Sequence, residues 1–310
     1  MFEHRNFRSY FNSLKNFEYL LCDSFIDTIS YTQSNCILVA GSSSLDHYIS
    51  DLQSIYKQYN TIIISCSSAY KTLYLNNIIP DYVIIADESR YELKNNGFYS
   101  TDSTLIYDPR IRYEITSSFK YRKVMNCKNY LLTMLTDIIP PNPIYNGTNI
   151  ATIMIQIASI LQFKKIFLIG YDFCYYNKQS HSSLHRNEYG WRTLHQLQDR
   201  NNIQCETTDA LLIFRQETET ILSQYNNIYQ DHKYGLFLPT QFMPINSITY
   251  KSYKSLISHP NPIIHSIYIP LILNTFITHN NIYLKPVSDY KPSLIPIFQH
   301  YIQEVFSKCI

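Results

Sequence analysis

The stretch IGYDFCYYNKQSHSSLHRNEYGW, residues 169–191, holds the densest group of side chains suited to chemistry. It offers an aspartate, four tyrosines and two histidines directly after an apolar run. Histidine titrates near neutral pH, so either His181 or His185 can act as general base toward a hydroxyl. The two stand four residues apart and could ligate a metal if this loop were helical, but no clear third ligand accompanies them. We therefore favour a general base with no metal site; the alternative is a solvated loop with incidental histidines.

Two loops of small residues are typical of anion sites. VAGSSSLD (39–46) leads from an apolar run into a helix that Ser43 or Ser44 could cap, and YNGTN (145–149) precedes another that Thr148 or Asn149 could cap. Free N–H groups at a helix start bind phosphate, although an ordinary capped turn explains either loop equally well. The candidate residues are Gly41, Ser42, Ser43, Ser44, Asn146, Gly147 and Thr148.

Two further candidates follow apolar runs. Ser67 lies in the serine cluster after TIIIS (61–65), and Asp87 ends DYVIIAD (81–87). A carboxylate at a strand end can hold Mg²⁺ or a ribose hydroxyl, or it can cap the next turn. Both interpretations of Asp87 stay open.

The elements that must position these residues alternate along the chain. Short apolar runs at 36–40, 61–65, 81–87, 104–108, 123–127 and 164–172 are typical of strands buried on both faces. Helical spacing follows at 45–59, 69–76 and 148–161. This alternation predicts an α/β fold: a Rossmann-like parallel sheet with helices on both faces. Right-handed crossovers would bring the carboxyl ends of the strands, and so the candidate residues, to one edge.

We expect three parts in the chain of 310 residues. Residues 1–34 form a helical lead-in, because Phe7, Tyr10, Phe11 and Leu14 recur at near-helical spacing. Residues 35–205 form the Rossmann-like core. Residues 206–310 form a mostly helical C-terminal region packed on the core, beginning with a helix at 207–224.

Composition excludes several classes of partner. The net charge is +2 and no basic run is present, which argues against a nucleic-acid partner. No apolar stretch has the length of a signal peptide or a membrane span. The seven cysteines are widely spread and contain no CxxC pair, which is typical of reduced thiols. We therefore expect a cytoplasmic protein without a membrane span.

Several stretches together resemble the family that contains the motility accessory factors (Maf) and the archaeal 6-hydroxymethylpterin pyrophosphokinase MptE. They are ILVAGSSSLDHYISDLQ, IIISCSSAYKTLYLNNIIPDYVIIAD and NGTNIATIMIQIASILQFKKIFLIGYDFCYYNKQSH. CETTDALLIFRQETETIL and NIYQDHKYGLFLPTQFMPINSI extend the likeness toward Maf, so that it covers about residues 36–250. The family has a Rossmann-like core, which is also similar to bacterial sialyltransferases that use CMP-activated nonulosonic sugars.

The resemblance assigns roles to the candidate residues. The loop from Gly41 to Ser44 and the segment from Asn146 to Thr148 would hold the nucleotide. Asp172, Tyr175 and Tyr176 would face the phosphate, and His181 would be the base, with His185 second. The family's first loop usually reads Gly-x-Gly-Pro-Ser-Leu, whereas residues 40–45 here read AGSSSL. A φ above zero at a replaced glycine would cost about 1 kcal/mol or more.

The resemblance implies a transferase that moves a nonulosonic acid of the pseudaminic or legionaminic type. The donor would be a CMP-sugar, the acceptor Ser or Thr of flagellin or a related protein, and no cofactor would be required. The alternative is an MptE-like pyrophosphokinase that needs ATP and Mg²⁺, with Asp87 as metal ligand. The altered first loop motivates a third hypothesis, a catalytically degenerate nucleotide-binding member.

Overall fold

The computed structural model describes residues 9, 12–13, 15–20, 23–26, 31, 34–58, 62–87, 102–125, 143–144, 149–184, 194–231, 233–236 and 238–245.

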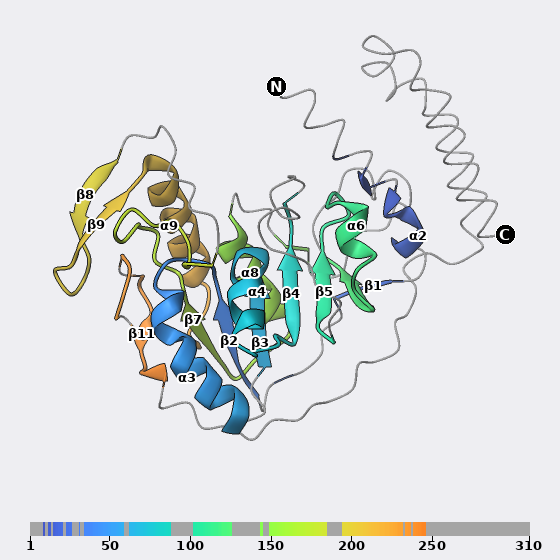
Figure 1. Ribbon diagram of the computed structural model, residues 1–310, viewed down its shortest axis with the longest axis horizontal. Helices are drawn as coiled ribbons and strands as arrows, with labels where there is room; N and C mark the ends of the chain where they lie inside the picture. The colour runs from blue at the N-terminus through green and yellow to red at the C-terminus, as the bar shows by residue number, and fades with distance from the viewer. Residues whose placement is uncertain are drawn as a thin grey trace, which may run out of the picture.

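Within the described part of the chain, nine strands form one sheet in the order β1-β6-β5-β4-β3-β2-β7-β10-β11 (Figure 1). All neighbouring strands run parallel, which confirms the α/β fold with a parallel sheet. The strands are β1 (Ser24–Phe25), β2 (Asn35–Val39), β3 (Ile62–Cys66), β4 (Tyr82–Ile85), β5 (Thr104–Tyr107), β6 (Tyr121–Val124), β7 (Lys165–Ile169), β10 (Ile228–Gln230) and β11 (Gln241–Phe242).

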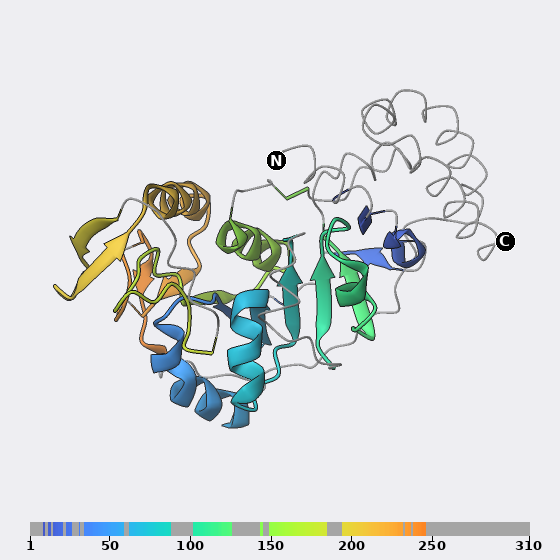
Figure 2. The ribbon, with the colours of Figure 1, turned by 45° about the horizontal axis from the view of Figure 1, so that its top comes forward.

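Helices cover both faces of this sheet, as Figure 2 shows: α3 and α4 lie on one face, and α8 and α9 on the other. Helix α8 has the apolar sequence IATIMIQIASI and is buried along most of its length. The described helices are α2 (Phe17–Leu20), α3 (Leu45–Gln58), α4 (Ser67–Leu75), α6 (Tyr113–Thr116), α8 (Ile150–Ile160) and α9 (Asp209–Leu222).

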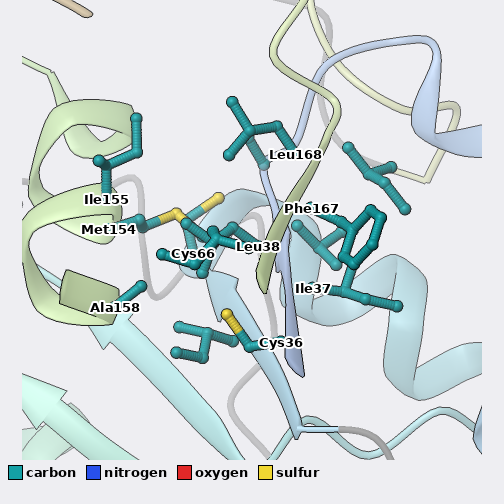
Figure 3. Packing of buried hydrophobic residues seen from close by; sticks show 14 of the residues in the cluster. Cys36, Ile37, Leu38, Cys66, Met154, Ile155, Ala158, Phe167 and Leu168 are labelled. Carbon is teal, nitrogen blue, oxygen red and sulfur yellow. The ribbon is translucent and has the colours of Figure 1, made fainter. Parts of the chain in front are cut away.

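Strand β2 lies within the core, and its residues Cys36 to Val39 are fully buried. In Figure 3, the side chain of Met154 of α8 extends toward Cys66 and Leu38 of the sheet. Ile37 and Phe167, which are paired in register, lie on the other side of the strands. Alternate residues of one strand therefore serve two helix layers, as the continuous apolar runs predict.

The sheet extends beyond the limits expected for the core. Strand β1, from the predicted lead-in, pairs with β6, and β10 and β11, from the predicted C-terminal region, continue the sheet beyond β7. Residues 246–310, and the spacing residues Phe7, Tyr10, Phe11 and Leu14, lie outside the described residues.

A separate antiparallel pair, β8 (His195–Gln198) and β9 (Gln204–Thr207), follows the core. It joins the segment after β7 through an antiparallel bridge between Tyr175 and Glu206. Among the helices that the structure describes, none has both the length and the apolar character needed to cross a membrane.

Candidate functional site

The strands that follow β2 in the chain are first added on one side of it and later on the other. From β2 the chain passes through α3 to β3 and continues outward to β6, whereas β7 returns after α8 to the opposite side of β2. Val39 and Ile169, which end β2 and β7, are register partners. In open parallel sheets, ligands bind beyond the carboxyl ends of the strands at such a switch point.

A cavity of about 300 Å³ lies at this switch point. The ends of β2 and β7, the starts of α4 and α8, and helix α9 contribute to its wall. The lining residues are Ala40, Gly41, Ser42, Ser68, Asn149, Ile150, Ala151, Gly170, Tyr171, Asp172, Phe173, Cys174, Tyr175, Ser180, His181, Leu211 and Phe214.

The predicted site residues divide into three groups. Those that line the cavity are Gly41, Ser42, Asp172, Tyr175 and His181. Those that the structure describes but does not place in this lining are Ser43, Ser44, Ser67, Tyr176 and Asp87. Those that lie outside the described residues are Asn146, Gly147, Thr148 and His185.

Two glycines allow the strand ends to approach closely. Gly170 has a φ of 73°, and a Cβ there would lie 2.2 Å from the carbonyl oxygen of Ala40. A Cβ at Gly41 would lie 2.3 Å from the Ser68 hydroxyl oxygen. The Ser42 hydroxyl donates to the Gly170 carbonyl at 2.6 Å, so β2 and β7 stay joined past their last paired residues.

The first loop carries none of the strain that its replaced glycines would predict. Across residues 40–44, all of them described, no φ is positive. Serine and alanine therefore fit this loop without the left-handed backbone that favours glycine.

The Asp172 carboxylate lies at the start of α3. It accepts the Ser44 N–H at 3.0 Å and the Ser44 hydroxyl at 2.6 Å. Burial raises the pKa of this carboxyl to about 6, although the Ser44 hydrogen bonds oppose the shift. The anion-binding position at α3 is thus filled by a side chain of the protein itself.

The segment after β7 folds back over the first loop. The Ser182 N–H donates to the Gly41 carbonyl at 3.1 Å, and the Ser182 and Thr72 hydroxyls are 2.6 Å apart. The Ser183 N–H donates to Asp46 of α3 at 2.7 Å. These contacts fix the residues that directly follow His181.

His181 enters the cavity lining from this fixed segment. Its Nδ1 lies 2.9 Å from the Ser180 hydroxyl oxygen. If Nδ1–H donates to Ser180, then Nε2 is the proton acceptor; the opposite tautomer reverses the two roles. The arrangement can therefore supply a base at the cavity through one ring nitrogen.

Asn149 organises the opposite wall as the N-cap of α8. Its side-chain oxygen accepts the Thr152 N–H at 3.1 Å, and its amide donates to Glu217 of α9 at 3.2 Å. Of the two caps that the sequence allowed, Asn149 is the one observed. The next residues, Ile150 and Ala151, line the cavity at the positive end of the helix dipole.

The two predicted tyrosines differ in position. Tyr175 lines the cavity, whereas the Tyr176 hydroxyl lies between two structural partners. It donates to Asp199 at 2.5 Å and accepts the Gly235 N–H at 2.6 Å. Tyr176 thereby links the β8–β9 hairpin to the segment before β11.

Sequence reasoning did not single out most of the lining residues, among them Ser68, Phe173, Leu211 and Phe214. Ser68 belongs to the predicted serine cluster, in which Ser67 was chosen instead. Phe173, at a φ of 52°, and Leu211 and Phe214 of α9 add an apolar wall. The sequence predicted a helix at 207–224, which contains α9, but gave no signal that it borders the site.

Asp87 is exposed and does not border the cavity. Among the described residues, no group of three or more His, Cys, Asp or Glu side chains is placed to hold a metal ion. Within the described lining, Asp172 is the one carboxylate, and both of its oxygens accept from Ser44. These residues do not fit a Mg²⁺ site, because Mg²⁺ prefers available carboxylate oxygens.

The fold and the cavity define a Rossmann-like α/β protein with a candidate ligand site at the switch point of its sheet. The chain belongs to the family described as 6-hydroxymethylpterin diphosphokinase MptE-like, whose model matches residues 11–178, just over half of the chain.

One solved structure similar to this chain is that of the Maf glycosyltransferase from Magnetospirillum magneticum AMB-1. The similarity has a TM-score of 0.57 at 17% sequence identity and covers 89% of this chain. The chain spans 41% of that protein's length. No curated protein matches the chain.

Proposed function

We propose that this protein is a Maf-like glycosyltransferase. It transfers a nonulosonic acid of the pseudaminic or legionaminic type from a CMP donor to Ser or Thr of flagellin or a related protein. The observation that carries the proposal is the switch-point cavity, where His181 and the start of α8 line the same space. The fold shared with the Maf glycosyltransferase supports it.

The polar wall suits the leaving nucleotide. Hydroxyls of Ser42 and Ser68 and the first residues of α8 line the cavity. A helix start and neutral donors stabilise the second negative charge that develops on the CMP phosphate as it departs. Asn146, Gly147 and Thr148 lie outside the described residues but come shortly before α8 in the sequence, and we assign them to this proposed phosphate site.

The proposed step breaks the bond between the anomeric carbon and the phosphate oxygen, and CMP leaves with the electron pair. The anomeric carbon gains oxocarbenium character, and the acceptor hydroxyl oxygen forms the new bond. His181 Nε2 takes the hydroxyl proton while Nδ1–H donates to Ser180. No cofactor takes part in this step.

The family match supports a second candidate function, that of an ATP- and Mg²⁺-dependent pyrophosphokinase of the MptE type. The description of the family model favours it. The poor fit of the described lining to Mg²⁺ places it second. A nucleotide-binding protein without activity is the third outcome that experiment has to separate.

The direct test incubates the protein with flagellin and a CMP-nonulosonate, and follows the acceptor by intact-mass spectrometry. The proposal expects the acceptor to gain one sugar residue, CMP to be released in equal amount, and EDTA to have no effect. A parallel reaction contains ATP, Mg²⁺ and a pterin alcohol. Transfer of pyrophosphate in that reaction, without sugar transfer in the first, would overturn the proposal.

A further inference from the structure

We propose that Asp172 is a positioning residue. Its carboxylate occupies the anion-binding position at the start of α3, so that the phosphate of a ligand has to bind elsewhere in the cavity. This inference deepens the proposed function and rests on it for the identity of the ligand. The occupation of α3 by Asp172 is independent of that identity.

The geometry resembles a helix cap completed by a residue of the segment after β7. In a capping box, a carboxylate three residues into the helix accepts the N–H of the cap residue. Here that position holds His47, and the carboxylate comes from Asp172, 128 residues away along the chain. Ser44 donates both its N–H and its hydroxyl to it.

The carboxylate is too enclosed for a ligand to share its position. Asp172 is 2% exposed, and its carbonyl oxygen accepts the Leu236 N–H at 2.9 Å. Gly235 packs so closely that a Cβ there would lie 2.7 Å from the Asp172 Cα. Backbone contacts on one side and α3 on the other therefore hold the carboxylate in place.

A ligand phosphate at Ser44 would have to displace this carboxylate or lie beside it. The single N–H of Ser44 cannot fully serve two anions, and two buried negative charges repel strongly. The same two hydrogen bonds join the end of β7 to the start of α3, on the chain segment that goes on to His181. Asp172 thus shapes the site through Ser44, without contact with the reacting atoms.

The test replaces the side chain and returns the anion from solution. In Asp172→Ala the space and both donors of Ser44 are vacant, so formate or inorganic phosphate should bind there. Formate should raise the melting temperature of this variant, and the Ser44 amide resonance should shift in saturable fashion with either anion. In the wild type, neither anion should move the Ser44 resonance.

Asp46→Ala is the matched control. The Asp46 carboxylate also links α3 to the segment after β7, because it accepts the Ser183 N–H, but it lies in a more accessible place than the Asp172 carboxylate. Water can replace it there, so formate should leave that variant unchanged. Equal formate responses in the two variants would overturn the proposal, as would a phosphate-dependent shift of Ser44 in the wild type.

Asp172→Asn covers the case in which the alanine variant does not fold. The amide keeps the volume and loses the charge, so the Ser44 N–H should exchange with solvent faster by about tenfold, as loss of a charge-assisted hydrogen bond predicts. Unchanged exchange would contradict the proposal. If CMP did not bind the wild type, the proposed function would be wrong. The formate and phosphate experiments would still test the role of Asp172, because they do not depend on CMP.

Discussion

His181 is positioned by its neighbours in the chain, not by a helix or strand. Ser180 contacts its Nδ1, and Ser182 fastens the backbone to Gly41. The sequence offered His181 and His185 as candidate bases, and the family resemblance placed His181 first. The contact between Ser182 and Gly41 could not be predicted, because it joins residues more than 100 positions apart.

Replacing His181 with alanine separates catalysis from binding. We expect His181→Ala to lower kcat for transfer by about 10²–10⁴, the usual contribution of a general base. The Kd for CMP should stay within about threefold, because the imidazole acts on the acceptor hydroxyl. Ser180→Ala keeps the imidazole and removes only its neighbour, so its loss of kcat should be smaller. A large loss of CMP affinity in His181→Ala would reassign the residue to nucleotide binding.

Asp172 makes the stability of the protein depend on pH. Its pKa rises from 3.8 to about 6 on folding. The folded state therefore holds an extra proton between these values, and the stability that it contributes is present below about pH 4 and lost as the pH rises through about 6. The full loss is about 3 kcal/mol. Urea denaturation from pH 4 to 7 should show this fall in the wild type relative to Asp172→Asn, in which the group does not titrate. Parallel curves for the two proteins would be inconsistent with a buried carboxyl.

At the scale of elements, the core strands and helices follow their sequence patterns closely. The run 164–172 contains β7, and the helix predicted at 45–59 is observed as α3, Leu45–Gln58. The very short strands β1, β10 and β11 carry no such signal. They are recognisable only through pairing with a neighbour that is already in place, since two or three residues have no period of their own.

The junction of β2 and β7 depends on Gly170. Gly170→Ala would place a methyl group against the Ala40 carbonyl at a φ of 73°. We expect it to lower the free energy of unfolding by about 2 kcal/mol or more, from backbone strain and steric overlap together. Asn177→Gly, at a φ of 50° on the exposed part of the same segment, should change it by less than about 0.5 kcal/mol. Similar chemical denaturation midpoints for Gly170→Ala and the wild type would refute the close approach.

Helix α8 offers a test of the proposed phosphate site. Asn149→Asp keeps the N-cap acceptor but places a carboxylate at the cavity and beside Glu217. Repulsion should weaken CMP binding by about tenfold, equal to about 1.4 kcal/mol. Asn149→Ser also retains an acceptor without charge and should bind CMP nearly as the wild type does. Calorimetry on both variants decides the matter, and equal affinities would place the phosphate away from α8.

At the scale of the whole molecule, strand order determines where the site lies. The reversal beside β2 brings together residues from the first loop, the start of α8 and the segment after β7. Alternation of strands and helices predicted one active edge but not the order of the strands along it. The contribution of Leu211 and Phe214 depends on the packing of α9 against α8, which no local pattern encodes.

The most direct measurement is calorimetric titration of the protein with CMP and with ATP, each with and without Mg²⁺. The glycosyltransferase account predicts that CMP binds at a single site with an affinity that Mg²⁺ does not change, and that ATP binds more weakly. Binding of ATP only in the presence of Mg²⁺, with no heat from CMP, would contradict the account and favour the pyrophosphokinase. No heat from either nucleotide would contradict it as well and favour a family member that has lost its nucleotide site.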